Sequence, residues 1–170
     1  MNGLKKMAKG IDSLNEAVGN IFGVIIIVLV VLTVMEVILR KFFNSPTIWS
    51  FEVLKQLFAL YFMITAAYGL LKGSHVAVDV FTRLLSDKWK AFVSICSYII
   101  FFFPFCLICT WYSYDYAMIS WGMREHSWSV FAPALYPIKT VIVFTFGLLL
   151  LQGIAEVIKN ILTFRELNYD

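Results

Sequence analysis

The chain has 170 residues, of which 61% are hydrophobic and only 15% are charged, and its formal net charge is +3. Soluble globular proteins average about 45–50% apolar and about 25% charged residues, so the composition argues against a water-soluble enzyme and against a nucleic-acid-binding protein. Three cysteines are too few for a disulfide-stapled secreted module. We therefore expect one integral membrane domain over residues 1–170, with little mass outside the bilayer.

Four long apolar stretches predict transmembrane helices. A helix needs about 20 apolar residues to cross about 30 Å of hydrocarbon, and lysines at the ends of the shorter stretches can extend them by snorkelling. The stretches are continuous, which favours an all-α fold over the alternating pattern of a β-barrel. The expected spans cover about residues 17–39, 52–72, 91–113 and 136–158.

Lysine and arginine residues predict the orientation of the spans, because cytoplasmic loops carry more of them. With a cytoplasmic N terminus, nine of the fourteen would lie inside and five outside, so both termini are expected to be cytoplasmic. The inner group is Lys5, Lys6, Lys9, Lys72, Arg83, Lys88, Lys90, Lys159 and Arg165; the outer group is Arg40, Lys41, Lys55, Arg124 and Lys139. The first span is long and lacks a small-residue cleavage site, which predicts a retained anchor.

Two segments outside the spans have amphipathic patterns. Residues 74–90 place apolar side chains on one helical face and charged ones opposite, so we expect a helix lying in the cytoplasmic interface. A cytoplasmic extension of the second span is the alternative. Residues 1–16 show a weaker version, with lysines that would attract anionic membrane lipid.

The ionisable residues favour structural roles over chemistry. Glu36 and Arg40 are one turn apart, and we expect a salt bridge at the outer end of the first span, with a proton or cation site as the alternative. Ser50 can cap the second span. His75 and His126 fall on opposite sides of the membrane and cannot share a metal ion. We expect no catalytic, cofactor or metal site, and the cysteines of the third span (Cys96, Cys106 and Cys109) to be inert.

A secondary transporter usually has broken helices, repeated halves and polar groups at the membrane midplane. Because these features are not visible in the sequence, the chain is expected to assist another membrane protein rather than to transport alone. Partner interfaces in lipid use small residues, so the second span offers a candidate face: Ala59, Ala66, Ala67 and Gly69. Pro104 is expected to kink the third span.

Three stretches resemble one protein family along nearly the whole chain. They are Arg40–Lys55 (RKFFNSPTIWSFEVLK), Gly69–Phe81 (GLLKGSHVAVDVF) and Trp128–Pro137 (WSVFAPALYP). These stretches resemble the small membrane subunit of tripartite ATP-independent periplasmic (TRAP) transporters, the DctQ family. Its characteristic spacings fall on Arg40, Trp49 and Glu52, and on His75 and Asp79, which we assign to structural interfaces.

The resemblance implies a function that composition does not. Such transporters import organic acid anions, such as sialic acid or dicarboxylates, across the bacterial inner membrane on a sodium gradient. A periplasmic solute-binding protein captures the solute, and a large membrane subunit moves it with an elevator-like part. The small subunit would be a non-enzymatic scaffold that binds the large subunit and helps dock the binding protein. Since the chain stops at Asp170, it would be separate from the large subunit rather than fused to it.

Two more expectations concern the outer side. We expect Arg40 and Glu52 to pair across the loop that Trp49 anchors, and so to hold the first two spans together. The connection 115–132 is aromatic and carries Arg124, Glu125, His126 and Trp128, so we expect it to dock the periplasmic protein through a water-facing cluster. The alternative for its tryptophans is a belt that fixes helix depth.

Two other functional classes stay open at this point. A four-helix homodimeric transporter would need a membrane-embedded acid, and Glu36 lies too near the end of its span. A structural anchor subunit of another membrane complex would need no such acid. A haem-bearing anchor is disfavoured by the lack of paired intramembrane histidines.

Overall fold

The structure is a computed structural model that describes residues 2–73 and 86–166. Nearly all of these residues are helical, because the apolar runs leave the backbone no hydrogen-bond partner other than itself in lipid. The helices are α1 (Asn2–Gly23), α2 (Ile25–Phe42), α3 (Ser50–Leu71), α5 (Asp87–Ser97), the π-helix η1 (Tyr98–Phe102), α6 (Phe103–Gly122) and α7 (Tyr136–Glu166).

The predicted all-α fold with four membrane-spanning helices is confirmed. Four helical stretches are long and apolar enough to cross a bilayer: Gly3–Phe42, Ser50–Leu71, Lys88–Gly122 and Tyr136–Arg165. The first, third and fourth extend beyond the spans expected from the sequence, whereas the second starts two residues earlier and ends one residue earlier than expected. The first and third each join more than one helical element.

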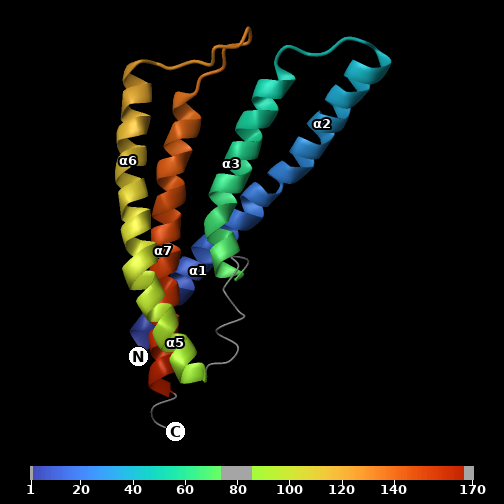
Figure 1. Cartoon of the computed structure of the whole chain (residues 1–170). Coiled ribbons are helices and arrows are strands. Elements are labelled where there is room, and N and C mark those ends of the chain that lie inside the picture. Colours follow the sequence, from blue (N-terminus) through green and yellow to red (C-terminus); the bar gives the residue numbers. More distant parts are fainter. Residues whose placement is uncertain (1, 74–85, 167–170) are drawn as a thin grey trace.

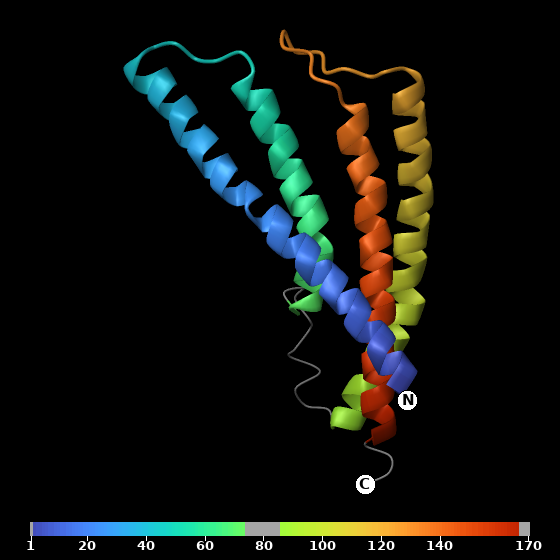
Figure 2. The same cartoon turned by 180° about the vertical axis from the view of Figure 1, so that it is seen from behind.

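Helix α7 occupies the centre of the arrangement and contacts α1, α3, α5 and α6 (Figure 1). Helix α2 packs chiefly against α3. The connections 43–49 and 123–135 lie at one end of the bundle, called here the loop end, and both termini lie at the other, the termini end. The pair α2–α3 diverges from the pair α6–α7 toward the loop end (Figures 1 and 2).

The N-terminal segment 1–16 does not end before the first span. Helix α1 continues through it to Gly23, and only a turn at Val24 separates α1 from α2. Ala8 and Ile11 pack against a cluster on α7, formed by Ala155, Ile158 and Leu162. Part of the predicted apolar face is therefore used inside the bundle, while Leu4, Met7 and Leu14 stay exposed. Its attraction to anionic lipid stays a prediction.

The predicted interfacial helix 74–90 falls mostly on residues 74–85, which lie outside the described residues, as do His75 and Asp79. Its last residues belong to α5, which starts at Asp87 and leads directly into the third span. The expected disturbance at Pro104 takes the form of the π-helix η1, which ends two residues before it. A wider turn suits this place, because proline lacks an N–H and its ring crowds the preceding carbonyls.

Two glycines allow close helix contacts around α1 and α7. A Cβ atom on Gly19 would lie 2.3 Å from Cγ of Tyr68 on α3, and one on Gly153 would lie 2.5 Å from Cε1 of Phe102. The Gly19 contact also reaches Cβ of Tyr68, at 2.7 Å. A side chain cannot rotate its own Cβ away, so α1 and α3 approach this closely only with glycine at position 19.

We predict that Gly19→Ala destabilises the chain by about 1–3 kcal/mol, the usual cost of forcing an extra methyl group into a packed contact. The control is Gly10→Ala on the same helix, where an added Cβ meets nothing within 4 Å. That control should be neutral or slightly stabilising, since alanine favours a helix over glycine by about 1 kcal/mol. Thermal unfolding of the purified chain in detergent measures both. Equal stability of the two variants would contradict the contact.

Candidate functional site

Polar side chains gather at the two ends of the bundle, and the first group joins α2 to the following loop. Arg40 Nη2 donates to Glu36 Oε1 at 2.8 Å, and Thr47 Oγ1 donates to Glu36 Oε2 at 2.6 Å. Glu36 as a whole residue is only 7% exposed. The predicted salt bridge one helical turn apart is therefore confirmed, and Thr47 additionally ties the loop 43–49 to it.

The expected pairing of Arg40 with Glu52 does not form in the described chain. Arg40 bonds Glu36 instead, since a partner four residues earlier on the same helix is reached without ordering a loop. Glu52 is nevertheless buried, in the first turn of α3. Trp49, and not Ser50, is the N-cap residue, and in the described chain the buried Ser50 hydroxyl makes no hydrogen bond that caps α3. The predicted Ser50 cap is thus wrong.

The second group surrounds the connection 123–135, called here the finger. The predicted connection 115–132 was placed too early in the chain, because residues 115–122 still belong to α6, which ends at Gly122. Two aromatic residues assigned to it therefore lie on α6: Trp121 Nε1 donates to Thr140 Oγ1 at 2.8 Å, and the Tyr116 ring faces Lys139 Nζ at 3.9 Å from its centroid. Nothing breaks the helical run before Gly122, so the aromatic residues extend the helix.

Glu125 anchors the finger to the bundle rather than facing water. Its carboxylate accepts hydrogen bonds from Lys139 Nζ and, at 2.8 Å, from Ser120 Oγ. The hydrogen bond from Lys139 lowers the pKa of Glu125 most, and the hydrogen bond from Ser120 lowers it further. A carboxyl with a lowered pKa contributes stability above its ordinary pKa and loses it only on acidification, so this ion pair persists through neutral pH.

The other expected docking residues are exposed. Arg124, His126 and Trp128 all lie on the surface of the finger. His126 Nδ1 lies 2.6 Å from the carbonyl oxygen of Arg124. The expected water-facing cluster is thus divided: Arg124 and His126 face outward, while Glu125 faces Lys139.

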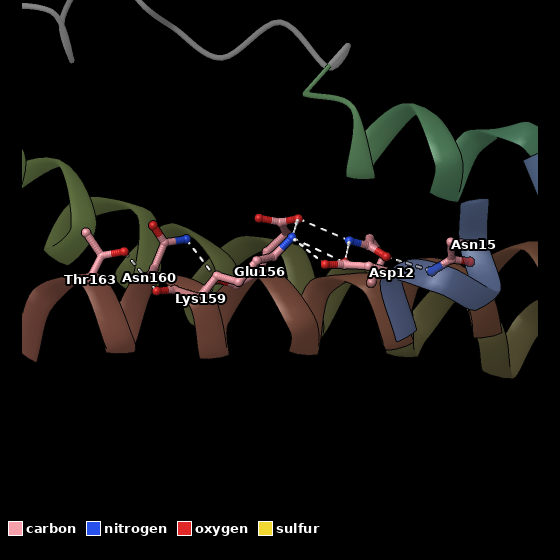
Figure 3. Close-up of polar contacts among 7 residues, drawn as sticks. Asp12, Asn15, Glu156, Lys159, Asn160 and Thr163 are labelled. Carbon is pink, nitrogen blue, oxygen red and sulfur yellow. Dashed lines mark hydrogen bonds and ion pairs between the residues drawn. The ribbon is translucent and has the colours of Figure 1, made fainter. Parts of the chain in front are cut away.

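The third group lies at the termini end and joins α1 to α7 (Figure 3). Asn15 Nδ2 donates to Gln152 Oε1 at 2.7 Å, and Gln152 Nε2 donates to Asp12 Oδ1 at 2.9 Å and to Glu156 Oε1 at 3.1 Å. Lys159 Nζ bonds Glu156 Oε1 at 2.5 Å and Asp12 Oδ1 at 3.2 Å. Gln152 is fully buried and Asn15 is 1% exposed.

The network was not predicted from the sequence, because the prediction considered ionisable residues within the spans and not amides. A signal was present: Gln152, Glu156 and Lys159 share one face of a helix, and Gln152 follows four leucines. The network pairs polar groups that lipid cannot satisfy, although the buried Asn15 Oδ1 finds no hydrogen bond among the described residues. Its two carboxylates already have a lysine between them. Within the described residues, no group of three His, Cys, Asp or Glu side chains is placed to hold a metal ion.

One residue of the expected partner face is used inside the chain. Ala67 is 1% exposed, buried within this chain, and the other three small residues of that face are half-buried. Large apolar side chains instead point outward from α2 and α6: Ile27, Val30, Val31, Val34 and Val37 on α2, and Phe105, Leu107, Ile108, Trp111 and Ile119 on α6. These helices therefore offer wider open faces to lipid or to a partner than α3 does.

We predict that Gln152→Leu destabilises the chain by about 1–3 kcal/mol, because it leaves the buried Asn15 amide without an acceptor. The double variant Asn15→Leu/Gln152→Leu should lose less than the sum of the two single variants, since no buried amide then stays unpaired. Asn20→Leu, which removes an exposed amide from the same helix, is the control. Unfolding in detergent measures each variant. Strict additivity of the two changes would show that the bond contributes nothing.

Comparison with known proteins agrees with these features. Residues 29–163 match the model of the family described as tripartite ATP-independent periplasmic transporters, DctQ component. The chain is also 31% identical over 86 residues to the "Sialic acid TRAP transporter permease protein SiaT" of Haemophilus influenzae (strain 86-028NP). That match covers 51% of this chain and 14% of the length of the relative.

The family match covers most of the chain, including α3, α5, α6 and most of α2 and α7. The chain is a multi-pass membrane protein and belongs to the DctQ family of TRAP transporter subunits.

Proposed function

We propose that the chain is the non-enzymatic small membrane subunit of a sodium-driven, binding-protein-dependent importer of organic acid anions. It binds the large membrane subunit, enlarges its static scaffold and helps dock the periplasmic solute-binding protein. Membership of the DctQ family is the observation that carries this proposal. The subunit resides in the bacterial inner membrane, with the loop end in the periplasm and both termini in the cytoplasm.

The distribution of polar and apolar side chains supports a scaffold role. The hydrogen-bonded polar groups joined to Gln152, Glu36 and Glu125 lie at the two ends of the bundle and stabilise contacts between the chain's own elements. The outward faces of α2 and α6 are apolar over several turns. Extended apolar faces suit lipid and the helices of a membrane partner.

The solute class is supported by the relative, whose name includes sialic acid, a carboxylic acid. Solute and sodium would bind in the large subunit. The orientation is supported by the excess of lysine and arginine on the side of the termini, and it places the exposed residues Arg124, His126 and Trp128 toward the periplasm.

The function is tested by expressing the chain with and without a large TRAP subunit. We expect the two to purify as one complex, and proteoliposomes that hold the complex to take up solute only when sodium and the binding protein are added. Proteoliposomes that hold this chain alone should take up none. Uptake by the chain alone would refute the scaffold role.

A charge reversal tests docking separately from assembly. We predict that Arg124→Glu slows uptake several-fold, because exposed rim charges govern the encounter of two proteins. Raising the concentration of the binding protein should relieve the defect. Lys41→Glu, which reverses an exposed charge at the loop end of α2, is the matched control and should have less effect. Unchanged uptake kinetics for Arg124→Glu would assign docking wholly to the large subunit.

A further inference from the structure

The tip of the finger, residues 128–131, exposes apolar side chains beyond the ends of the helices. Trp128 is fully exposed and Val130 is 90% exposed. In both views the finger runs from the end of α6 across the loop end of the bundle toward α3, and its tip lies beyond the ends of α6 and α7 (Figures 1 and 2). A tryptophan that only fixed helix depth would lie at the level of the helix ends, among the lipid head groups.

The finger is held as a short antiparallel ribbon. Leu135 N donates to Glu125 O at 2.9 Å, Ser127 N donates to Pro133 O at 2.9 Å, and His126 pairs with Ala134 between them. These bonds join the two arms of the finger below its tip. The tip is therefore carried on paired backbone and not on a single extended strand of chain.

Contacts from three helices brace the base of this ribbon. Glu125 is bonded by Ser120 of α6 and by Lys139 of α7, and Lys139 is 8% exposed. From α3, Gln56 Nε2 donates to Ala134 O at 3.2 Å. The finger is thus tied to both halves of the diverging bundle.

Two residues of the finger have backbone angles that non-glycine residues rarely adopt. Arg124 has φ 46° and Ala132 has φ 44°. Arg124 comes directly before the first arm of the ribbon, and Ala132 comes directly before the second. Such angles persist only where surrounding contacts determine them, and they concentrate at functional sites. At Arg124 the surrounding contacts are the bonds at the base, and at Ala132 they are the bonds from its own N–H to the carbonyl oxygen and hydroxyl of Ser129. The backbone is therefore ordered on both sides of the tip that presents Trp128 and Val130.

A braced support with an uncovered tryptophan at its tip has the features of an interface anchor. Tryptophan is enriched among the residues that dominate binding energy, where it fills a pocket on the partner. An anchor that is already ordered before binding loses less entropy on binding. The exposed Arg124 and His126 lie below the tip, where they can form a polar rim.

We propose that Trp128 and Val130 are a preformed apolar anchor that inserts into an apolar pocket on the surface of the periplasmic solute-binding protein. This inference rests on the proposed function and adds to it the residues and the chemistry of docking. The soluble partner is favoured over lipid and over the large membrane subunit because the tip lies beyond the ends of α6 and α7, whereas both of these would surround the sides of the helices. Apolar contact then sets the lifetime of the docked state, and Arg124 sets the rate of encounter.

The test measures binding of the solute-loaded binding protein to the purified complex of this chain and the large subunit. Trp128→Ala should weaken binding about tenfold or more, the loss expected for an interface anchor, mainly through faster dissociation. Trp128→Phe should retain most of the affinity. Trp89→Ala, which removes an exposed tryptophan from α5 at the opposite end of the bundle, is the matched control and should leave binding unchanged. The effect of Trp128→Ala should be the same at low and high salt, whereas that of Arg124→Glu should shrink as salt rises.

Three results would overturn the anchor. Unchanged binding by Trp128→Ala together with weaker binding by Arg124→Glu would refute the anchor and leave the proposed docking role intact. Unchanged binding by both variants would refute the anchor and the docking role together. Loss of the large subunit from the Trp128→Ala preparation would place the tip in the contact between the two membrane subunits.

Discussion

The amide of Gln152 lies fully buried at the end of an apolar stretch of α7, and the rest of the packing depends on how it is paired. Lipid offers it no hydrogen bond, so the amide must meet a partner from another helix. Asn15 donates to the oxygen of this amide, and Asp12 and Glu156 accept hydrogen bonds from its nitrogen. This pairing sets the position of α1 along α7. Four residues beyond Asn15, Gly19 passes Tyr68 at a distance that excludes any side chain.

Once α1 is placed, its direction determines where α2 lies. The two helices are separated by a single turn residue, so α2 leaves the bundle along nearly the same line and packs chiefly on α3 (Figure 2). The loop end therefore has separate braces: Glu36 with Arg40 and Thr47 for α2, and Glu125 with Lys139 for α6 and α7. The hydrogen bond of Gln56 to Ala134 links the two halves there. This arrangement leaves much of α2 open along its length.

The helices and the number of spans could be predicted because a continuous apolar run has only one way to satisfy its backbone in lipid. The Glu36–Arg40 bridge could be predicted too, since one helical turn determines the distance. Contacts between helices that are distant in sequence depend on tertiary packing, which the sequence pattern does not reveal. The sequence therefore predicts for Lys139 only that it extends the end of a span by snorkelling toward water. Its pairing with Glu125 required knowing that α6 continues to Gly122 and that the finger folds back. Gln152 could have been noticed from its apolar neighbours, but its partner on α1 could not.

In this chain polar side chains are buried between helices and apolar side chains face outward, which is the reverse of the arrangement in a soluble protein. Buried amides and ion pairs join the helices of this chain, while aliphatic and aromatic side chains face outward along α2 and α6 and at the tip of the finger. The reason is that lipid gives apolar helices no net drive to associate, so hydrogen bonds and close packing must choose which helices meet. Water beyond the membrane restores the hydrophobic effect, and there an exposed tryptophan again favours binding. Loss of an internal polar contact should therefore lower the stability of the fold, and loss of an exposed apolar residue at the tip should weaken a partner's binding while the fold persists.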